Sequence, residues 1–119
     1  MKKSTRVYDF DKMPMEKLGE KSSRRYISGE HATFVCFELK RGALVPTHHH
    51  PSEQMSYVTR GKVKVTAEGK EFSVSKGELI HIPPEVPHQF EAMEDSTVLD
   101  VFSPPRKDWL EGKDSYLRK

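Results

Sequence analysis

The sequence has very little cysteine and almost no excess of charge of one sign. Cys36 is the single cysteine among 119 residues, so a disulfide within the chain and a structural zinc finger are both excluded. It stands in the apolar run 34–37, where we expect a small buried side chain rather than a nucleophile. Lys and Arg number 20 against 18 Asp and Glu, and the charges are interspersed, which argues against a nucleic-acid-binding protein with a basic stripe.

Long apolar runs are missing as well. No run approaches the roughly 20 residues that a membrane-spanning helix needs, and the first nine residues contain no apolar signal core. We therefore expect a single cytoplasmic domain that binds neither membrane nor nucleic acid.

Short apolar bursts, separated by turn residues, occupy the chain from Tyr26 onward. Their recurrence every 8 to 12 residues or so is typical of an all-β sandwich or barrel. The expected strands are Ala32–Leu39, Gln54–Thr59, Lys62–Ala67, Glu71–Val74, Leu79–Ile82, His88–Ala92 and Thr97–Phe102. Valine and lysine alternate in the burst 62–67, as a half-buried strand requires, and Glu68-Gly69-Lys70 predicts a tight hairpin turn after it.

The pattern divides the chain into three parts. Residues 1–25 are polar and mixed, and we expect an N-terminal arm with at most one short strand near Val7–Phe10. Residues 26–103 carry the expected barrel, and residues 104–119 form a C-terminal tail that packs on it. Within this tail, Asp108–Leu117 is expected as a short helix or packed arm that Gly112 interrupts.

Candidate metal ligands gather in two segments. Side chains at His48 and His50 point to the same face if this segment is a strand, while His49 points away. Gln54 opens the next strand, and His88 begins another after a proline-rich connection. Three imidazoles and one oxygen donor suit a single divalent transition metal ion such as Ni, Zn, Fe, Mn or Co. A surface histidine run without metal is the alternative.

The late strand carries a second set of candidates. Asp100 and Phe102 share one face of this strand, and an ionisable residue there is costly unless it is paired or functional. Arg106 follows two prolines that restrict the path of the chain. The alternatives are a solvent-facing Asp100 and a surface ion pair of Arg106.

At these residues the chain resembles the cupin superfamily. The first cupin motif has Gly, five residues, His-x-His, three or four residues, Glu, six residues and Gly. The second has Gly, five to seven residues, Pro-x-Gly, two residues and His. The positions that match are Gly42, His48, His50 and Gly61, then Gly77, Pro83 and His88. Gln54 replaces the motif glutamate, and Glu85 replaces a motif glycine. The resemblance implies a double-stranded β-helix, the cupin jelly-roll barrel, with a metal site.

The departure at Gln54 has a chemical consequence. A glutamine carbonyl is a neutral ligand, so the site keeps the full charge of a divalent cation and favours anionic substrate oxygens. Glu53 precedes Gln54 and is expected to face away from it, as a solvated charge at the rim of the barrel.

The late strand narrows the resemblance to the KdgF-type cupins of pectin and alginate breakdown. Their pattern Asp-x-Phe-x-Pro-x-Arg-x-Asp-(Trp/Phe)-Leu is met by Asp100, Phe102, Pro104, Arg106, Asp108, Trp109 and Leu110. This resemblance implies catalytic roles for Asp100, Arg106 and Phe102, and linearisation of 4,5-unsaturated uronate monosaccharides to 5-keto-4-deoxyuronate. Differences in cavity shape are expected from Met55, Tyr57, His81 and Met93.

Two other functions fit the same residues. The histidines could hold iron in a mononuclear dioxygenase, or the barrel could bind a sugar or small acid without turnover. In each case the partner is a small molecule. We also expect a homodimer, because cupins commonly pair through their sheets and the N-terminal arm could add an edge strand to a neighbouring copy.

Overall fold

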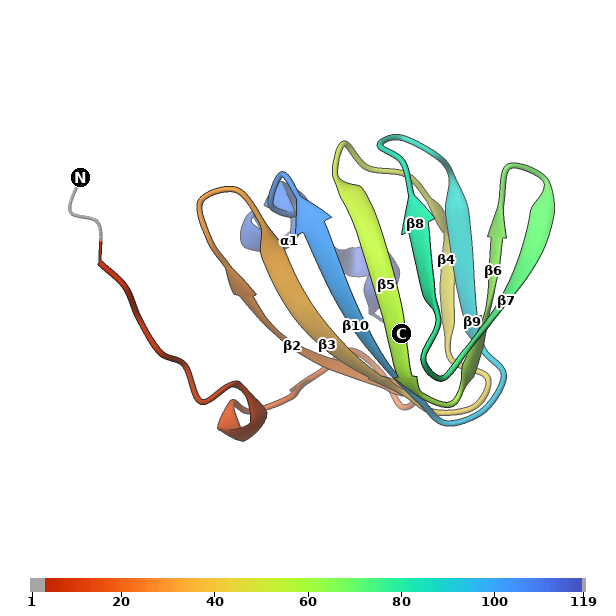
Figure 1. Cartoon of the computed structure of the whole chain (residues 1–119), viewed down its shortest axis with the longest axis horizontal. Coiled ribbons are helices and arrows are strands. Elements are labelled where there is room, and N and C mark those ends of the chain that lie inside the picture. The colour runs from red at the N-terminus through yellow and green to blue at the C-terminus, as the bar shows by residue number, and fades with distance from the viewer. Residues whose placement is uncertain (1–3, 119) are drawn as a thin grey trace.

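Two antiparallel sheets face each other in the computed structural model, which describes residues 4–118 (Figure 1). Within these residues the first sheet has six strands, in the spatial order β1 (Glu16–Lys17), β2 (Ser22–Ser28), β3 (Thr33–Leu39), β10 (Ser96–Ser103), β5 (Glu53–Arg60) and β8 (Leu79–Ile82). The second has four, in the order β4 (Leu44–His48), β9 (His88–Ala92), β6 (Lys62–Ala67) and β7 (Lys70–Ser75). This jelly-roll barrel confirms the all-β prediction.

The core lies between the two sheets, and valine is its most frequent residue. In β6, Val63 and Val65 are fully buried while Lys64 reaches toward solvent, so the predicted alternation holds. Val35 and Val58 meet them from the opposite sheet and are also fully buried. Cys36 is buried as predicted.

Tight turns set the register of the strands at two places. Glu68 and Gly69 have φ values of 54° and 71° and join β6 to β7, which confirms the predicted hairpin. Gly61 has a φ of 85°, and a Cβ at this position would lie 2.3 Å from the carbonyl oxygen of Asp95. Only glycine fits at position 61, which explains why the first cupin motif ends with a glycine there.

The N-terminal region differs from the prediction. The strand expected near Val7–Phe10 is wrong, because Val7 is 98% exposed and η1 (Phe10–Lys12) is a single 3-10 turn. Instead, β1 and the start of β2 precede residue 26 and extend the six-stranded sheet. The sequence did not indicate β2 as a strand because most of its residues are polar. Arg24 is buried there because it pairs with Asp114 of the tail. Residues 1–3 of the expected arm lie outside the described residues.

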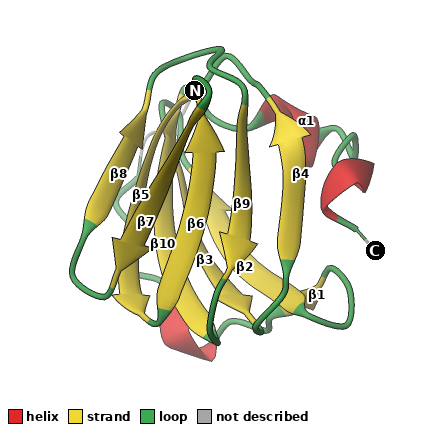
Figure 2. Ribbon diagram, turned by 90° about the vertical axis from the view of Figure 1, so that its right-hand side faces the viewer, coloured by secondary structure: helices red, strands yellow, loops and turns green. Residues whose placement is uncertain are grey.

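The tail packs against the barrel through two buried side chains, Trp109 and Leu117. It contains α1 (Lys107–Leu110) and η2 (Ser115–Leu117), and Figure 2 shows both helical turns on the side of β4. Gly112 separates them with a φ of 71°. Trp109 and Leu117 are buried and extend the barrel core. None of the helices described in residues 4–118 is long and apolar enough to cross a membrane.

Candidate metal centre

Adjacent strand ends bring the predicted histidines together. His48 ends β4 and His88 begins β9, and the two are register partners across these strands. His50 lies in the loop after β4 rather than on a strand, yet its ring centroid is 5.0 Å from that of His88. One ring nitrogen from each of the three histidines lies within 4.8 Å of the others. His49 points away from this cluster and its side chain is 64% exposed, as the sequence predicts.

Backbone carbonyls orient all three imidazoles in the same way. The Nδ1 atoms of His48, His50 and His88 lie 2.9, 2.9 and 2.8 Å from the carbonyl oxygens of Pro46, Ser52 and Val86. A carbonyl oxygen only accepts, so each Nδ1 carries the proton and each Nε2 keeps its lone pair. Hydrogen bonding of the second ring nitrogen is the usual way in which a protein orients a metal-binding histidine.

The environment keeps these imidazoles neutral. Burial lowers the pKa of His48 and of His50 to about 4, and it also lowers the pKa of His88. The Nε2 atom of His88 is buried and has no hydrogen-bond partner among residues 4–118. A buried, unpaired lone pair is costly, and a metal ion is a partner that would satisfy it. The cluster therefore fits a divalent cation.

Gln54 completes the donor set at the start of β5. Its Nε2 donates to Ser56 Oγ at 3.0 Å, and this contact turns Oε1 toward His50, 3.1 Å from Nε2. Because the neutral His50 carries its proton on Nδ1, the two facing atoms are both lone-pair donors. A cation shared by these atoms would remove their repulsion. Glu53 lies on the other face, beside His81, so its carboxylate is remote from the ring cluster.

Asp100 and Phe102 reach the same interior from β10. The Asp100 side chain is buried, and its Oδ1 has no hydrogen-bond partner within the described chain. Burial raises the pKa of Asp100 to about 7, although the Ser56 hydroxyl and the Arg106 charge oppose this increase. The Phe102 ring lies 5.5 Å from that of His50. The alternative of a solvent-facing Asp100 is wrong.

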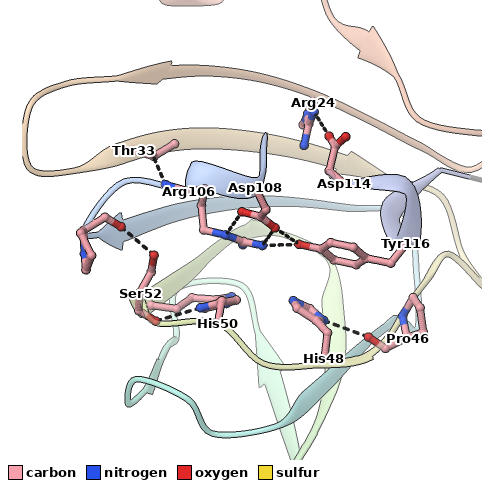
Figure 3. Close-up of polar contacts among 12 residues, drawn as sticks. Arg24, Thr33, Pro46, His48, His50, Ser52, Arg106, Asp108, Asp114 and Tyr116 are labelled. Atoms are coloured by element: carbon pink, nitrogen blue, oxygen red, sulfur yellow. Dashed lines mark hydrogen bonds and ion pairs between the residues drawn. The ribbon is translucent and has the colours of Figure 1, made fainter. Parts of the chain in front are cut away.

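Arg106 is buried too, so the alternative of a surface ion pair is also wrong. Its guanidinium makes a bidentate contact with Asp108, with Nε to Oδ1 at 3.0 Å and Nη2 to Oδ2 at 2.7 Å. Nη2 also contacts the Tyr116 hydroxyl, which donates to Asp108 Oδ2 at 2.8 Å. Figure 3 shows these three tail side chains facing His48 and His50. The backbone N–H of Arg106 donates to Thr33 Oγ1 at 3.2 Å.

Two hollows meet at Arg106. An inner cavity of about 30 Å³ is lined by groups that include His48, His88 and Asp100. A groove of about 270 Å³ lies on the other side of Arg106, between the loop after β4 and the start of the tail. Arg106 borders both hollows, and Asp108 borders the groove.

Sequence reasoning missed one member of the site and misplaced four others. Nothing in the sequence indicates that Tyr116 reaches the histidines, yet its ring centroid lies 4.7 Å from that of His48. The side chains expected to change the cavity shape lie on the outside of the protein instead, as a group that comprises Met55, Tyr57, His81 and Met93. Gln54, Ser56 and Val58 of β5 face inward, so Met55 and Tyr57 between them face outward.

The second cupin motif contributes to the geometry through Glu85, which replaces the motif glycine. Glu85 adopts a φ of 64°, a conformation that glycine enters more readily. Its backbone N–H donates to the His50 carbonyl oxygen at 2.8 Å, and its carboxylate lies 2.9 Å from His49 Nδ1. These two contacts link the loop after β4, which carries His49 and His50, to the loop that precedes His88.

Comparisons with known proteins agree with this geometry. The family model of the cupin domain matches residues 35–102. Over 108 residues the chain is 31% identical to the pectin degradation protein KdgF of Dickeya dadantii, covering 88% of this chain and 98% of that protein. The structure of KdgF from Halomonas sp. is similar with a TM-score of 0.83 and 28% identity, covering 89% of this chain and 99% of that one.

Another similar structure is that of a metal-containing protein. Oxalate decarboxylase from Bacillus subtilis, a protein with Mn(II) centres, has a TM-score of 0.72 and 26% identity to this chain. The similarity covers 82% of this chain but only 29% of that one.

Proposed function

Because the chain belongs to the cupin family, we propose that it is a metal-dependent enzyme whose three clustered histidines and Gln54 hold one divalent transition metal ion. The observation that carries this proposal is the buried Nε2 of His88, which has no hydrogen-bond partner among residues 4–118 and faces two further imidazoles. Ni, Zn, Fe, Mn and Co all suit such a donor set. A bound ion of this kind supplies Lewis acidity toward substrate oxygen atoms.

The reaction we propose is the linearisation of 4,5-unsaturated uronate monosaccharides to 5-keto-4-deoxyuronate. Similarity to the pectin degradation protein KdgF supports this substrate class, as do a buried arginine and a buried carboxyl group beside the histidines. The reaction is an isomerisation. The bond between C1 and the ring oxygen breaks, the C1 hydroxyl loses its proton to leave an aldehyde, and C4 gains a proton as C5 becomes a ketone.

Asp100 is the group proposed to move the proton. With its pKa raised to about 7, it is present in both protonation states at neutral pH. It can therefore accept a proton from the C1 hydroxyl and deliver one to C4, which is the behaviour that general acid–base catalysis requires. Phe102 forms an apolar wall near the histidines and helps to keep this carboxyl group away from water.

Arg106 is the group proposed to bind the substrate carboxylate. Its planar guanidinium can hold a carboxylate through two parallel hydrogen bonds, which lysine cannot reproduce. The guanidinium carbon lies 4.7 Å from the centre of the Phe102 ring, on the side of the cavity that the tail covers. This position would turn the sugar ring toward Asp100 and the histidines.

The test follows the ultraviolet absorbance of the unsaturated sugar as it decays with and without protein. We expect acceleration by the metal-loaded protein on a galacturonate-derived or a mannuronate-derived sugar. Arg106→Lys should weaken substrate affinity by roughly 1–3 kcal/mol, because the charge stays but the planar fork is lost. If the wild-type protein leaves both decays unchanged, the uronate assignment fails.

The two other functions give different outcomes in the same experiment. A mononuclear iron dioxygenase would act only with Fe(II) and O₂, so anaerobic assays separate it from an isomerase. A binding or sensor protein would be stabilised by the ligand without forming product.

We also propose that the protein pairs with a second copy through the outer face of the six-stranded sheet. Large apolar side chains on neighbouring strands stay 40–55% exposed there, and the group comprises Phe34, Met55, Tyr57, Leu79 and Val101. A contiguous apolar face of this kind marks an association surface. Sedimentation analysis of the wild-type protein and of Val101→Glu checks this proposal, with a dimer expected to become a monomer. The cytoplasmic location stays a prediction.

A further inference from the structure

We propose that Asp108 and Tyr116 mask the carboxylate-binding position of Arg106, and that a carboxylate ligand must displace them to enter the barrel. The inference rests on the proposed function in one respect, namely that the ligand carries a carboxylate which Arg106 binds. It adds that the protein supplies its own carboxylate to this arginine when the ligand is away.

The hydrogen bonds of Arg106 support the mask. Nε and Nη2 are one of the two donor pairs through which a guanidinium binds a carboxylate bidentately, and both already contact Asp108, while the contact of Nη2 with Tyr116 obstructs the other pair. Tyr116 completes the arrangement by contacting Nη2 and donating to Asp108 Oδ2. A second carboxylate cannot bind this edge of the guanidinium until Asp108 leaves. The Asp108 side chain is 29% exposed and borders the outer groove, so it can rotate toward solvent.

The size of the inner cavity supports the same conclusion. At about 30 Å³ it has room for little more than a water molecule. Sites for small organic ligands typically measure about 300–1,000 Å³. The groove of about 270 Å³ on the other side of Arg106 is much closer to that range. His50 lines this groove, and a sugar acid that docks there meets the Arg106–Asp108 pair before it can reach the inner cavity with His88 and Asp100.

The wall that must move is the turn η2. Residues 111–113 before it are exposed, and apart from Gly112 and its two chain neighbours no heavy atom of the described chain lies within 4 Å of the Cβ position at Gly112. Tyr116 packs its ring on His48, and Leu117 lines the inner cavity. The preceding turn α1 is held by the Trp109 ring, which packs against three aromatic rings at centroid distances of 5.0, 5.4 and 5.9 Å, and Asp114 is held by its ion pair with Arg24, so the movement begins after Asp114. An opening movement would therefore carry Tyr116 and Leu117 away from the cavity.

A purely positioning role for Asp108 and Tyr116 predicts the opposite change in ligand affinity. If Asp108 and Tyr116 only positioned Arg106 for the ligand, removing their hydrogen bonds would weaken ligand binding. If they mask Arg106, removing those bonds makes displacement easier and strengthens ligand binding. General damage to the fold would also weaken binding, so a gain in affinity is expected from the mask alone.

The experiment measures binding of galacturonate, a saturated acid that lacks the reacting double bond, with galactose as the neutral control. Trp109 is the single tryptophan of the chain and lies against Arg106, with the guanidinium carbon 4.8 Å from its ring centre, so its fluorescence reports the site. Tyr116→Phe removes only the hydroxyl, and we expect it to bind galacturonate about threefold to tenfold more tightly than the wild type. Asp108→Asn should bind more tightly as well. Tyr57→Phe, on the outer sheet face, is the matched control and should leave affinity unchanged.

Each outcome distinguishes this inference from the proposed function. Weaker or unchanged galacturonate binding by both Tyr116→Phe and Asp108→Asn overturns the mask, even if the wild type accelerates the uronate reaction. Absence of galacturonate binding in all variants also overturns it. Tighter binding by the variants with no acceleration of the unsaturated sugar by any of them supports the mask and overturns the uronate reaction. Equal responses to galacturonate and galactose would overturn the mask too, because Arg106 would then not select a carboxylate.

Discussion

The histidine centre and the C-terminal tail face each other across one cavity, but different kinds of contact hold them. The three imidazoles are oriented by backbone carbonyls within two residues of each of them in the sequence. Arg106 is oriented by side chains, Asp108 and Tyr116, of which the second lies ten residues away in a separate helical turn. Local backbone contacts form whenever the strands pair, whereas the tail contacts require distant segments to pack first. The proposed metal ligands therefore depend on contacts local to the barrel, whereas the proposed carboxylate-binding arginine depends on how the tail packs.

The largest expected effect concerns the histidine side of this comparison. His50→Ala removes one of three imidazoles and leaves too few ligands for tight metal binding at neutral pH. Elemental analysis of protein purified without chelators should find close to one transition metal ion per chain in the wild type and far less in the variant. His49→Ala is the matched control, because this neighbour points away from the cluster, and it should keep its metal. Wild-type protein that contains no metal and gains no thermal stability from added Ni²⁺, Zn²⁺, Mn²⁺ or Fe²⁺ would rule out the centre.

The next effect tests the chemistry between the two regions. Asp100→Asn keeps the shape of the side chain but cannot transfer a proton, so turnover should fall by roughly 10²–10⁴-fold. Metal content should stay at the wild-type value, since Asp100 lies on β10, apart from the predicted ligands. Absorbance decay of the unsaturated sugar measures the first quantity and elemental analysis the second. A variant as fast as the wild type would remove Asp100 from the mechanism without affecting the metal assignment.

A third effect concerns how the tail is attached. Arg24 and Asp114 form a buried ion pair between β2 and the tail, and the Arg24 guanidinium lies over Trp109 at 4.3 Å. Asp114→Ala removes the buried charged partner of this arginine and leaves only the half-exposed Glu16, 3.0 Å from Nε, so the free energy of unfolding should fall by an amount at the lower end of roughly 3–5 kcal/mol.

Urea unfolding measures that loss, and the emission of Trp109 should shift to longer wavelength as the tail detaches. Lys113→Ala removes an exposed pair with Glu111 in the same tail and serves as the control, with almost no loss expected. Equal losses in the two variants would show that burial of the Arg24–Asp114 pair has no special role.

The smallest effect compares the buried titratable groups of the metal-free protein at different pH values. The pKa of Asp100 is raised from 3.8 to about 7, so the folded state loses stability as pH increases through this window. Asp100→Asn should therefore gain roughly 3 kcal/mol in unfolding free energy relative to the wild type between pH 5 and pH 8.

The histidines give the opposite slope. The pKa values of His48 and His50 are lowered from 6.5 to about 4, so their contribution is present above pH 6.5 and is lost as pH falls toward 4. Urea unfolding of metal-free wild type and Asp100→Asn across this range separates the two slopes. Parallel curves for the two proteins would contradict the burial effect on Asp100.

The sequence alone determined the barrel and the centre of the candidate site. Strands β6, β8 and β9 coincide with the predicted bursts, because alternation with period two and tight turns are local properties. The same local rule places His48, Gln54 and His88 toward the interior. The residues whose positions follow from strand alternation and turn chemistry could therefore be identified from the sequence alone.

Only the tertiary structure revealed the remaining contacts of the site, because those contacts join segments far apart in the chain. Strand β2 shows no apolar pattern, since Arg24 is buried there through Asp114, which lies ninety residues later. Tyr116 lies in a short polar tail, and only folding places its ring on His48. The sequence identified Arg106, but it did not show that Asp108 already binds the guanidinium. Whether two side chains far apart in the sequence meet depends on how the tail packs against the barrel. No local sequence pattern encodes that packing.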